Sequence, residues 1–182
     1  MARVACILAD GFEEIEGLTV VDLLRRAEID VKMVSITGKL EVIGSHEIKI
    51  VADSLFHEED FNETEMIVLP GGMPGTKHLG EYEPLINLLK DFANKEKYIA
   101  AICAAPSVLG MNGILNGKKA ISYPGFYDKL QGATISNEKV VVDRTIITSK
   151  GLGTSIDFAL TIIKLLKDEE IALSIAKSIQ YM

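Results

Sequence analysis

The segment Tyr98–Gly110, YIAAICAAPSVLG, places a thiol where an apolar, strand-like run ends and a helix should begin. Pro106 supports this boundary, because proline is favoured in the first turn of a helix. The N-terminus of a helix offers free N–H groups and positive potential, and both favour thiolate over thiol. The pattern predicts a nucleophile elbow with Cys103 as the nucleophile. The alternative is that Cys103 is a small buried hydrophobic residue, as we expect for Cys6, which lies inside an apolar run.

Paired glycines follow another apolar run, at Gly71 and Gly72. Such a pair lets backbone N–H groups approach a ligand closely. Together with the N–H group of Ala104, they would stabilise an oxyanion. The alternative is a simple tight turn.

A group of carboxylates crowds the start of the first expected helix, at Glu13, Glu14 and Glu16 in the segment DGFEEIEG. Acidic residues there are expected as partners of the helix dipole. A carboxyl group that reached the thiol would instead hold a proton, hydrogen-bond the sulfur and move protons during catalysis.

These segments must be positioned by strands that alternate with helices. Apolar runs predict buried strands, and apolar spacing of three and four residues predicts helices. This alternation predicts one domain over residues 1–182, an α/β fold with a mostly parallel sheet and helices on both faces. Ligands bind beyond the carboxyl ends of such strands, where the three segments would meet. The expected strands are 3–9, 29–36, 66–70, 98–102 and two short strands around Arg144, with a hairpin or an edge excursion within 41–53. Helices are expected at 15–28, around 85–92, after 106, around 158–166 and at 169–180.

Composition narrows the class of protein. The chain has 182 residues and a formal charge of −7, which argues against nucleic acid as the main partner. No apolar run reaches the roughly 20 residues of a membrane helix, and the N-terminus shows no signal peptide, so we expect a cytoplasmic protein with no membrane partner. Two cysteines make no disulfide framework, and no Cys/His spacing is typical of zinc. We expect neither a cofactor nor a metal.

Four segments, in order, resemble the ThiJ/PfpI superfamily over nearly the whole chain: ILADGFEEIE, VLPGGMPG, AAICAAPSVL and TSKGLGTSIDFAL. Within it, the chain is most similar to the branch of the Parkinson-linked protein deglycase and the bacterial ThiJ/YajL-like proteins. The resemblance implies a flavodoxin-like three-layer sandwich and a homodimer. It also implies Cys103 as the reactive nucleophile, Glu16 as its protonated partner, and Gly72 and Ala104 as backbone donors, with Gly71 lining the pocket.

At other positions this chain matches the residues typical of this branch only in part. Arg26 and His46 match positions near the dimer contact and the cysteine pocket, although His46 replaces a commoner arginine. Many members carry a histidine before a proline near the cysteine, whereas this chain has Tyr123. A tyrosine with a reference pKa near 10 is a poor base at neutral pH. Protease-like relatives carry histidine directly after the cysteine, where this chain has Ala104, so we do not expect peptidase activity.

Two functions from different classes remain. The first is a glutathione-independent glyoxalase or deglycase, in which the Cys103 thiolate adds to a small carbonyl compound such as methylglyoxal and Glu16 moves the proton. The second is an oxidative-stress sensor or redox-regulated chaperone without significant turnover, because a reactive thiol is also the first to be oxidised. A role in thiazole monophosphate biosynthesis is less favoured, since the segment GLGTS (residues 151–155) is better read as a helix start than as a phosphate site.

Overall fold

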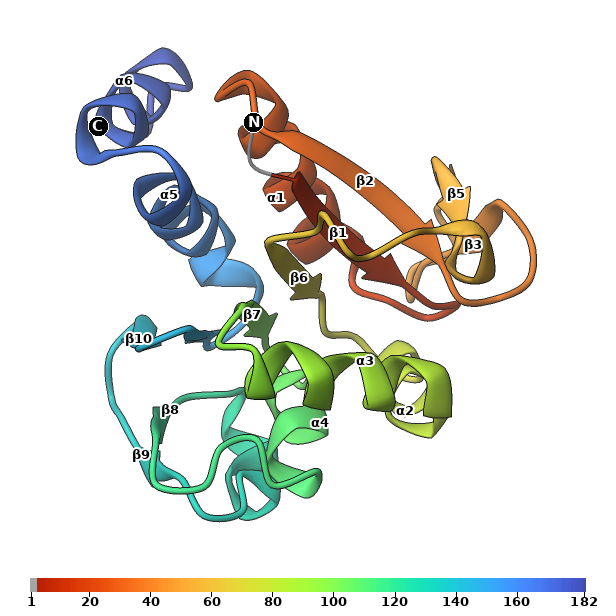
Figure 1. Ribbon diagram of the computed structural model, residues 1–182. Coiled ribbons are helices and arrows are strands. Elements are labelled where there is room, and N and C mark those ends of the chain that lie inside the picture. The colour runs from red at the N-terminus through yellow and green to blue at the C-terminus, as the bar shows by residue number, and fades with distance from the viewer. Residues whose placement is uncertain (1–2) are drawn as a thin grey trace.

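A twisted sheet of seven strands forms the centre of the molecule in the computed structural model, which describes residues 3–182 (Figure 1). The strand order is β10-β11-β7-β6-β1-β2-β5, and every neighbouring pair is parallel except β10 with β11. This confirms the predicted mostly parallel α/β architecture. The strands are β1 (Arg3–Leu8), β2 (Asp30–Ser35), β5 (Ser54–Leu55), β6 (Met66–Leu69), β7 (Tyr98–Ile102), β10 (Val140–Asp143) and β11 (Ile146–Ser149).

The central strands are apolar on both faces because helices cover the sheet on both sides. In β1, Val4, Cys6 and Leu8 belong to one core, while Ala5 and Ile7 belong to the other. This alternation follows from the two-residue period of a strand, and a continuous apolar run is what a doubly covered sheet requires.

Two groups of helices make the outer layers (Figure 1). On the face of Val4 lie α1 (Glu14–Arg26), α5 (Ser155–Leu166) and α6 (Glu169–Ser178). On the opposite face lie α2 (Gly75–Glu81), α3 (Glu83–Asn94) and α4 (Pro106–Met111). The molecule is therefore the three-layer sandwich that the family resemblance implies. No helix within residues 3–182 is both long and apolar enough to span a bilayer.

Smaller elements complete the chain. The hairpin predicted within 41–53 forms as an antiparallel pair of its own, β3 (Glu41–Ile43) with β4 (Lys49–Val51). Sequence patterns did not predict the two-residue strands, because so short a segment carries no period. These are β5, β8 (Lys119–Ala120) and β9 (Thr134–Ile135), and the 3-10 helices are η1 (Phe56–Glu58), η2 (Pro124–Lys129) and η3 (Leu152–Thr154).

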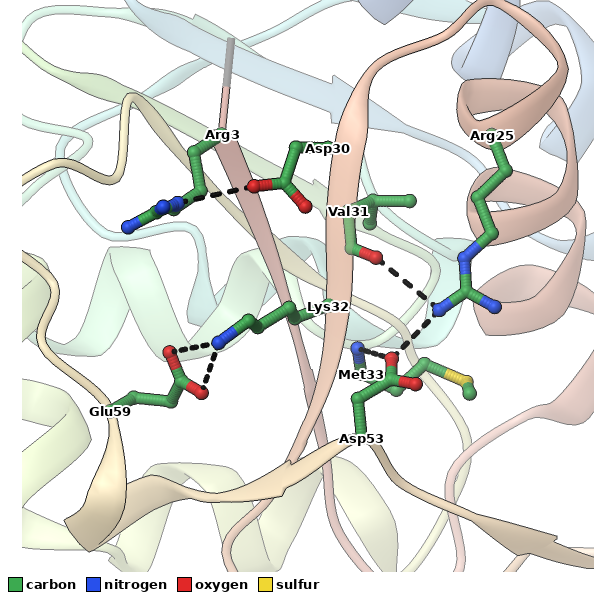
Figure 2. Close-up of polar contacts among 8 residues, drawn as sticks. All are labelled: Arg3, Arg25, Asp30, Val31, Lys32, Met33, Asp53 and Glu59. Atoms are coloured by element: carbon green, nitrogen blue, oxygen red, sulfur yellow. Dashed lines mark hydrogen bonds and ion pairs between the residues drawn. The ribbon is translucent and has the colours of Figure 1, made fainter. Parts of the chain in front are cut away.

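Polar contacts fasten the chain that follows the hairpin to the edge of the sheet (Figure 2). Asp53 accepts a hydrogen bond from the backbone N–H of Met33 at 2.7 Å and pairs with Arg25 of α1, also at 2.7 Å. Lys32 pairs with Glu59 at 2.8 Å. Ion pairs close to the protein surface contribute little free energy each, so the main effect of these two pairs is to fix where this segment lies beside β2.

Candidate active site

Three loops meet beyond the carboxyl ends of β1, β6 and β7, as the sequence predicts. The backbone N–H of Glu13 donates to the carbonyl oxygen of Gly71 at 2.8 Å, and that of Gly75 donates to Gly11 at 3.0 Å. These bonds join the loop after β1 to the loop after β6. The loop after β7 begins with Cys103 and completes the group.

The backbone of Cys103 is held in an uncommon conformation. Its φ angle is 64°, in the left-handed region that few residues other than glycine adopt. The N–H of Cys103 donates to the carbonyl oxygen of Ser149 at 3.0 Å, and its carbonyl oxygen accepts from the N–H of Tyr123 at 2.8 Å. Such strain persists only where the surroundings enforce it and concentrates at functional sites. The side chain of Cys103 is half-buried, whereas Cys6 is fully buried in β1, and burial raises the pKa of Cys6 to about 12.

Glu16 reaches the thiol from the first turn of α1. It is 1% exposed and makes a side-chain hydrogen bond with Cys103. Its Oε2 accepts the backbone N–H of Gly71 at 2.9 Å, and the backbone of Leu152 gives a further hydrogen bond. Burial raises the pKa of Glu16 to about 7, although the hydrogen bonds from Cys103 and Gly71 act in the opposite direction. This carboxyl group therefore keeps a proton at pH values where an ordinary glutamate has lost it.

The thiol and the carboxyl group form a pair that resists a second negative charge. Burial, followed by the charge of an ionised Glu16 and its hydrogen bond, raises the pKa of Cys103 to about 12. Backbone hydrogen bonds from Ala104 and Gly72 lower it. With one proton removed, the charge lies either on the carboxylate or on the sulfur, so the first ionisation belongs to the pair rather than to either residue.

The paired glycines are required by space around these two side chains. A Cβ atom on Gly71 would lie 2.6 Å from Cβ of Cys103 and 2.7 Å from Oε2 of Glu16. Gly72 has φ of +90°, and a Cβ there would lie 2.3 Å from the backbone nitrogen of Glu13. The close approach of backbone to nucleophile therefore depends on glycine at both positions.

Sequence reasoning missed a fourth loop that covers the site, at Gly151 and Leu152. A Cβ on Gly151 would lie 3.7 Å from Sγ of Cys103 and 3.8 Å from Oε1 of Glu16. Thr154 fixes this loop, because its Oγ1 donates to the carbonyl oxygen of Gly151 at 2.8 Å. The signal was the glycine-containing segment GLGTS (residues 151–155), whose pattern favours a helix start over an anion site and which lies within one of the four family-like segments.

The remaining predicted pocket residues, Tyr123, His46 and Arg26, lie at different distances from the thiol. The ring of Tyr123 lies beside Gly151, and its side chain is 54% exposed. His46 contacts Glu14 at 3.0 Å next to the start of α1. Within one chain Arg26 does not reach the thiol: it is exposed at the far end of α1 and pairs with Asp22 at 2.8 Å. Ten residues of helix separate Arg26 from Glu16, which corresponds to roughly 15 Å along the axis.

Comparison with known proteins agrees with this architecture. The sequence profile of the DJ-1/PfpI family matches residues 2–165. The chain is 39% identical over 176 residues to the Parkinson disease protein 7 homolog of Danio rerio, covering 93% of this chain and 92% of that protein. It is 40% identical over 172 residues to protein DJ-1 homolog B of Arabidopsis thaliana, and that match covers 94% of this chain but only 39% of the plant protein.

Solved structures give the same result. Oxidized Toxoplasma gondii DJ-1 superposes with a TM-score of 0.95 at 35% identity, covering 99% of this chain and 98% of that one. A DJ-1 superfamily protein from Salmonella typhimurium, with one cysteine replaced by alanine, gives a TM-score of 0.96 at 34% identity, covering both chains completely. The profile match and the identities over nearly the full chain confirm the resemblance seen in the sequence: this chain belongs to the DJ-1/PfpI family.

Proposed function

We propose that this protein is a glutathione-independent enzyme that acts on reactive carbonyl compounds, with Cys103 as nucleophile and Glu16 as proton carrier. The observation that supports this most directly is the buried Glu16 carboxyl group, its pKa raised to about 7, in hydrogen-bond contact with the Cys103 thiol. A general acid–base group works best when its pKa lies near the operating pH.

The proton of the singly ionised pair resides on Glu16. Cys103 is half-buried, while Glu16 is 1% exposed. A charge costs less free energy on the atom with better solvation, so the sulfur carries it. The backbone N–H groups of Ala104 and Gly72 also hydrogen-bond the sulfur and favour its ionised form.

With methylglyoxal as substrate, the thiolate adds to the aldehyde carbon and forms a carbon–sulfur bond, while the electron pair of the C=O bond moves to oxygen. The N–H groups of Gly72 and Ala104 stabilise this oxyanion, and Glu16 protonates it to give a hemithioacetal. The Glu16 carboxylate then removes the proton from the former aldehyde carbon and returns it to the neighbouring carbon through an enediol. Water hydrolyses the resulting thioester, releasing lactate and the thiol, with no external oxidant or reductant.

The test is lactate formation from methylglyoxal without added glutathione. Wild-type protein should produce lactate, and Cys103→Ala should not. Cys6→Ala is the matched control, because Cys6 is the other thiol and lies fully buried in β1. Equal turnover by wild type and Cys103→Ala would exclude this mechanism. A parallel assay with an early methylglyoxal adduct of a blocked amino acid tests deglycase activity through the same thiol.

A redox-sensing or chaperone role without turnover is the second candidate, since the same half-buried thiol is open to peroxide. The thiolate would attack one oxygen of hydrogen peroxide, forming the S–O bond of a sulfenic acid as the O–O bond breaks, and the departing hydroxide would take the proton of Glu16 and leave as water. A second equivalent of peroxide would oxidise the sulfenic acid to the sulfinate. Toxoplasma gondii DJ-1, the relative described above, is known in an oxidized form. Mass spectrometry after mild peroxide treatment discriminates: selective oxidation of Cys103 without carbonyl turnover favours this role, whereas equal oxidation of Cys6 contradicts it.

A homodimer is part of the proposal. Apolar side chains are exposed at the start of α1 and on the neighbouring hairpin, where Ile15 is 49%, Ile48 is 52% and Val51 is 68% exposed. A second copy that covered them would also lie close to Cys103. Light scattering should give the mass of two chains, and Val51→Glu should reduce it to one. We further propose a cytoplasmic location and no nucleic-acid partner.

A further inference from the structure

We propose that a cavity between α2, α4 and η2 binds a small organic anion, with the apolar body of the ligand against the cavity wall and its carboxylate toward Lys77 and Lys129. The cavity has a volume of about 280 Å³, near the lower end for small-molecule sites in proteins. It lies in the helix layer on the opposite side of the sheet from α1, and neither Cys103 nor Glu16 lines it. The site is therefore separate from the proposed carbonyl chemistry.

The backbone around the cavity is fixed by the turns that also surround the thiol. The helix α4 lies between α2 and η2 and contacts both. Ser107, in the first turn of α4, donates its hydroxyl hydrogen to the carbonyl oxygen of Ala104 at 2.7 Å. Met73 directly follows Gly72 in the chain. The cavity is thus already formed in the unliganded chain, as most small-molecule sites are.

Much of the cavity wall is apolar. Met73 is 51% exposed and Met111 is 60% exposed, while Val108 is buried and Phe126 is half-buried. Methionine side chains are flexible and adapt to apolar ligands of different shape. Such a wall suits a planar ring system or a short branched chain.

The absence of a side chain at Gly80 opens the cavity from the side of α2. Gly80 lies inside this helix, where glycine is less favourable than alanine. A Cβ atom there would meet only Cγ2 of Val108, at 3.7 Å, which is an ordinary van der Waals distance. Packing of α2 against α4 therefore does not require glycine at this position. Its effect is to leave the space beside Val108 free for a ligand.

The charged residues around the cavity favour an anion. Lys77 comes from α2 and Lys129 from η2, so positive charge reaches the cavity from two walls. Nζ of Lys129 lies 5.1 Å from the centroid of the Phe126 ring, next to the apolar surface. Among the described residues that line the cavity, Glu81 alone is acidic, and it contacts Lys77 at 3.8 Å in an exposed pair. One positive charge is left over, and a carboxylate would balance it.

A buried hydroxyl group gives an independent reason to expect a polar ligand atom. Thr76 lines the cavity and is 4% exposed, and its Oγ1 has no hydrogen-bond partner within residues 3–182. A buried hydroxyl group without a partner is unfavourable, because it has lost its hydrogen bonds to water. A ligand carboxylate supplies the missing acceptor once the hydroxyl group turns toward the cavity.

The test follows binding to the full-length protein by NMR, with carbon-13 in the methionine methyl groups. The probe is 2-naphthoate, and the matched ligand is 2-naphthamide, which has the same rings and no charge. Adding 2-naphthoate should shift the signals of Met73 and Met111 saturably and leave those of Met33 and Met66 in place, since the last two do not line the cavity. The amide should bind about two- to fivefold more weakly, the loss expected for a partly exposed ion pair.

Variants separate the cavity from the rest of the surface. Gly80→Leu fills the cavity and should abolish the shifts, whereas Asn87→Leu places the same side chain on exposed α3 and should leave the affinity unchanged. The double variant Lys77→Gln/Lys129→Gln should remove the preference for the acid over the amide. Thr76→Val, which keeps the shape of the side chain without its hydroxyl group, should also weaken binding of 2-naphthoate. Unchanged Met33 and Met66 signals show that each variant is folded.

Equal binding of 2-naphthoate by Gly80→Leu and wild type would overturn the site, as would shifts that do not saturate or that spread equally to Met33 and Met66. Equal affinity of wild type for the acid and the amide would overturn the assignment of an anion. None of these measurements depends on lactate formation, so failure of this proposal and failure of the carbonyl chemistry are distinguishable.

Discussion

Glu16, in the first turn of α1, forms a hydrogen bond with the thiol of Cys103, which follows β7, and the same carboxyl group accepts the N–H of Gly71. Three segments distant in sequence therefore converge on one sulfur. The chemistry depends on which member of this pair holds the single proton.

Two substitutions of Glu16 distinguish the proton's position. Glu16→Gln keeps an uncharged N–H donor beside the sulfur, whereas Glu16→Leu keeps a similar volume without a donor. Because we place the charge of the singly ionised pair on the sulfur, we expect the pH midpoint of Cys103 alkylation in wild type to lie below the free-thiol value of about 8.5, and to change little in Glu16→Gln. In Glu16→Leu, burial without a donor should raise the midpoint above the free-thiol value of about 8.5. The rate of iodoacetamide alkylation against pH measures all three.

An ionised Glu16 beside a neutral Cys103 thiol leads to the opposite prediction for the alkylation midpoint of Glu16→Leu. If Glu16 were ionised beside a neutral thiol, its removal would relieve repulsion of the thiolate. Glu16→Leu would then alkylate with a lower midpoint than wild type. That result would contradict the proposed mechanism.

Glu16 should also make folding stability depend on pH. The pKa of Glu16 is raised from 4.5 to about 7 in the folded protein, and the Cys103–Glu16 pair loses its first proton there, so between these values the folded state holds one proton that the unfolded state has lost. This stabilising contribution is complete below pH 4.5 and disappears as the pH rises through 7, amounting to roughly 3 kcal/mol at most. Urea unfolding at several pH values should show the decline in wild type. In Glu16→Gln the decline should be absent, and an identical decline in both proteins would refute the assignment.

Alanine substitutions at two glycines, Gly71 and Gly153, test how tightly the chain packs around the nucleophile. Gly71→Ala would drive a methyl group to within 2.6 Å of Cβ of Cys103, whereas nothing lies within 4 Å of a Cβ on Gly153. We expect Gly71→Ala to lower the free energy of unfolding by about 1–3 kcal/mol, as overpacking does. Gly153→Ala should change it by less than about 0.5 kcal/mol. Denaturant titrations measure both, and equal stability of the two variants would show that the loop after β6 can move aside.

Much of the fold follows from local sequence patterns. The run Met66–Leu69 is fully buried, as a central strand of a doubly covered sheet must be, and the hairpin within 41–53 forms where alternation indicates it. Pattern alone did not choose among the three glutamates that begin α1. Only the family resemblance selected Glu16, and the structure shows the reason: Glu14 faces the hairpin turn, while Glu16 faces the sulfur.

The features that the sequence did not predict are contacts between segments that lie far apart in the chain. The loop at Gly151 covers the thiol because β11 ends beside β7. Nothing in the sequence of either strand indicates that these two strands pair. The contact between His46 and Glu14 likewise requires the hairpin to fold back over the start of α1. Arg26 is expected, from the resemblance, near the dimer contact and the cysteine pocket; within one chain, the length of α1 places it at the far end of that helix from Glu16.

Tyr123 stands where the family resemblance implies a histidine, and this expected difference can be tested in both directions. Its backbone N–H donates to the carbonyl oxygen of Cys103 at 2.8 Å, a bond that histidine or phenylalanine at position 123 can also make. A histidine has a reference pKa of about 6.5 and can act as a base near neutral pH, whereas tyrosine, near 10, cannot. Tyr123→His should therefore raise kcat/KM for methylglyoxal by at least about tenfold. Its pH profile should gain a limb near 6.5, and Tyr123→Phe should leave turnover unchanged. Loss of turnover in Tyr123→Phe would instead show that the phenol takes part in the reaction, and Glu16 would then not be the sole proton carrier.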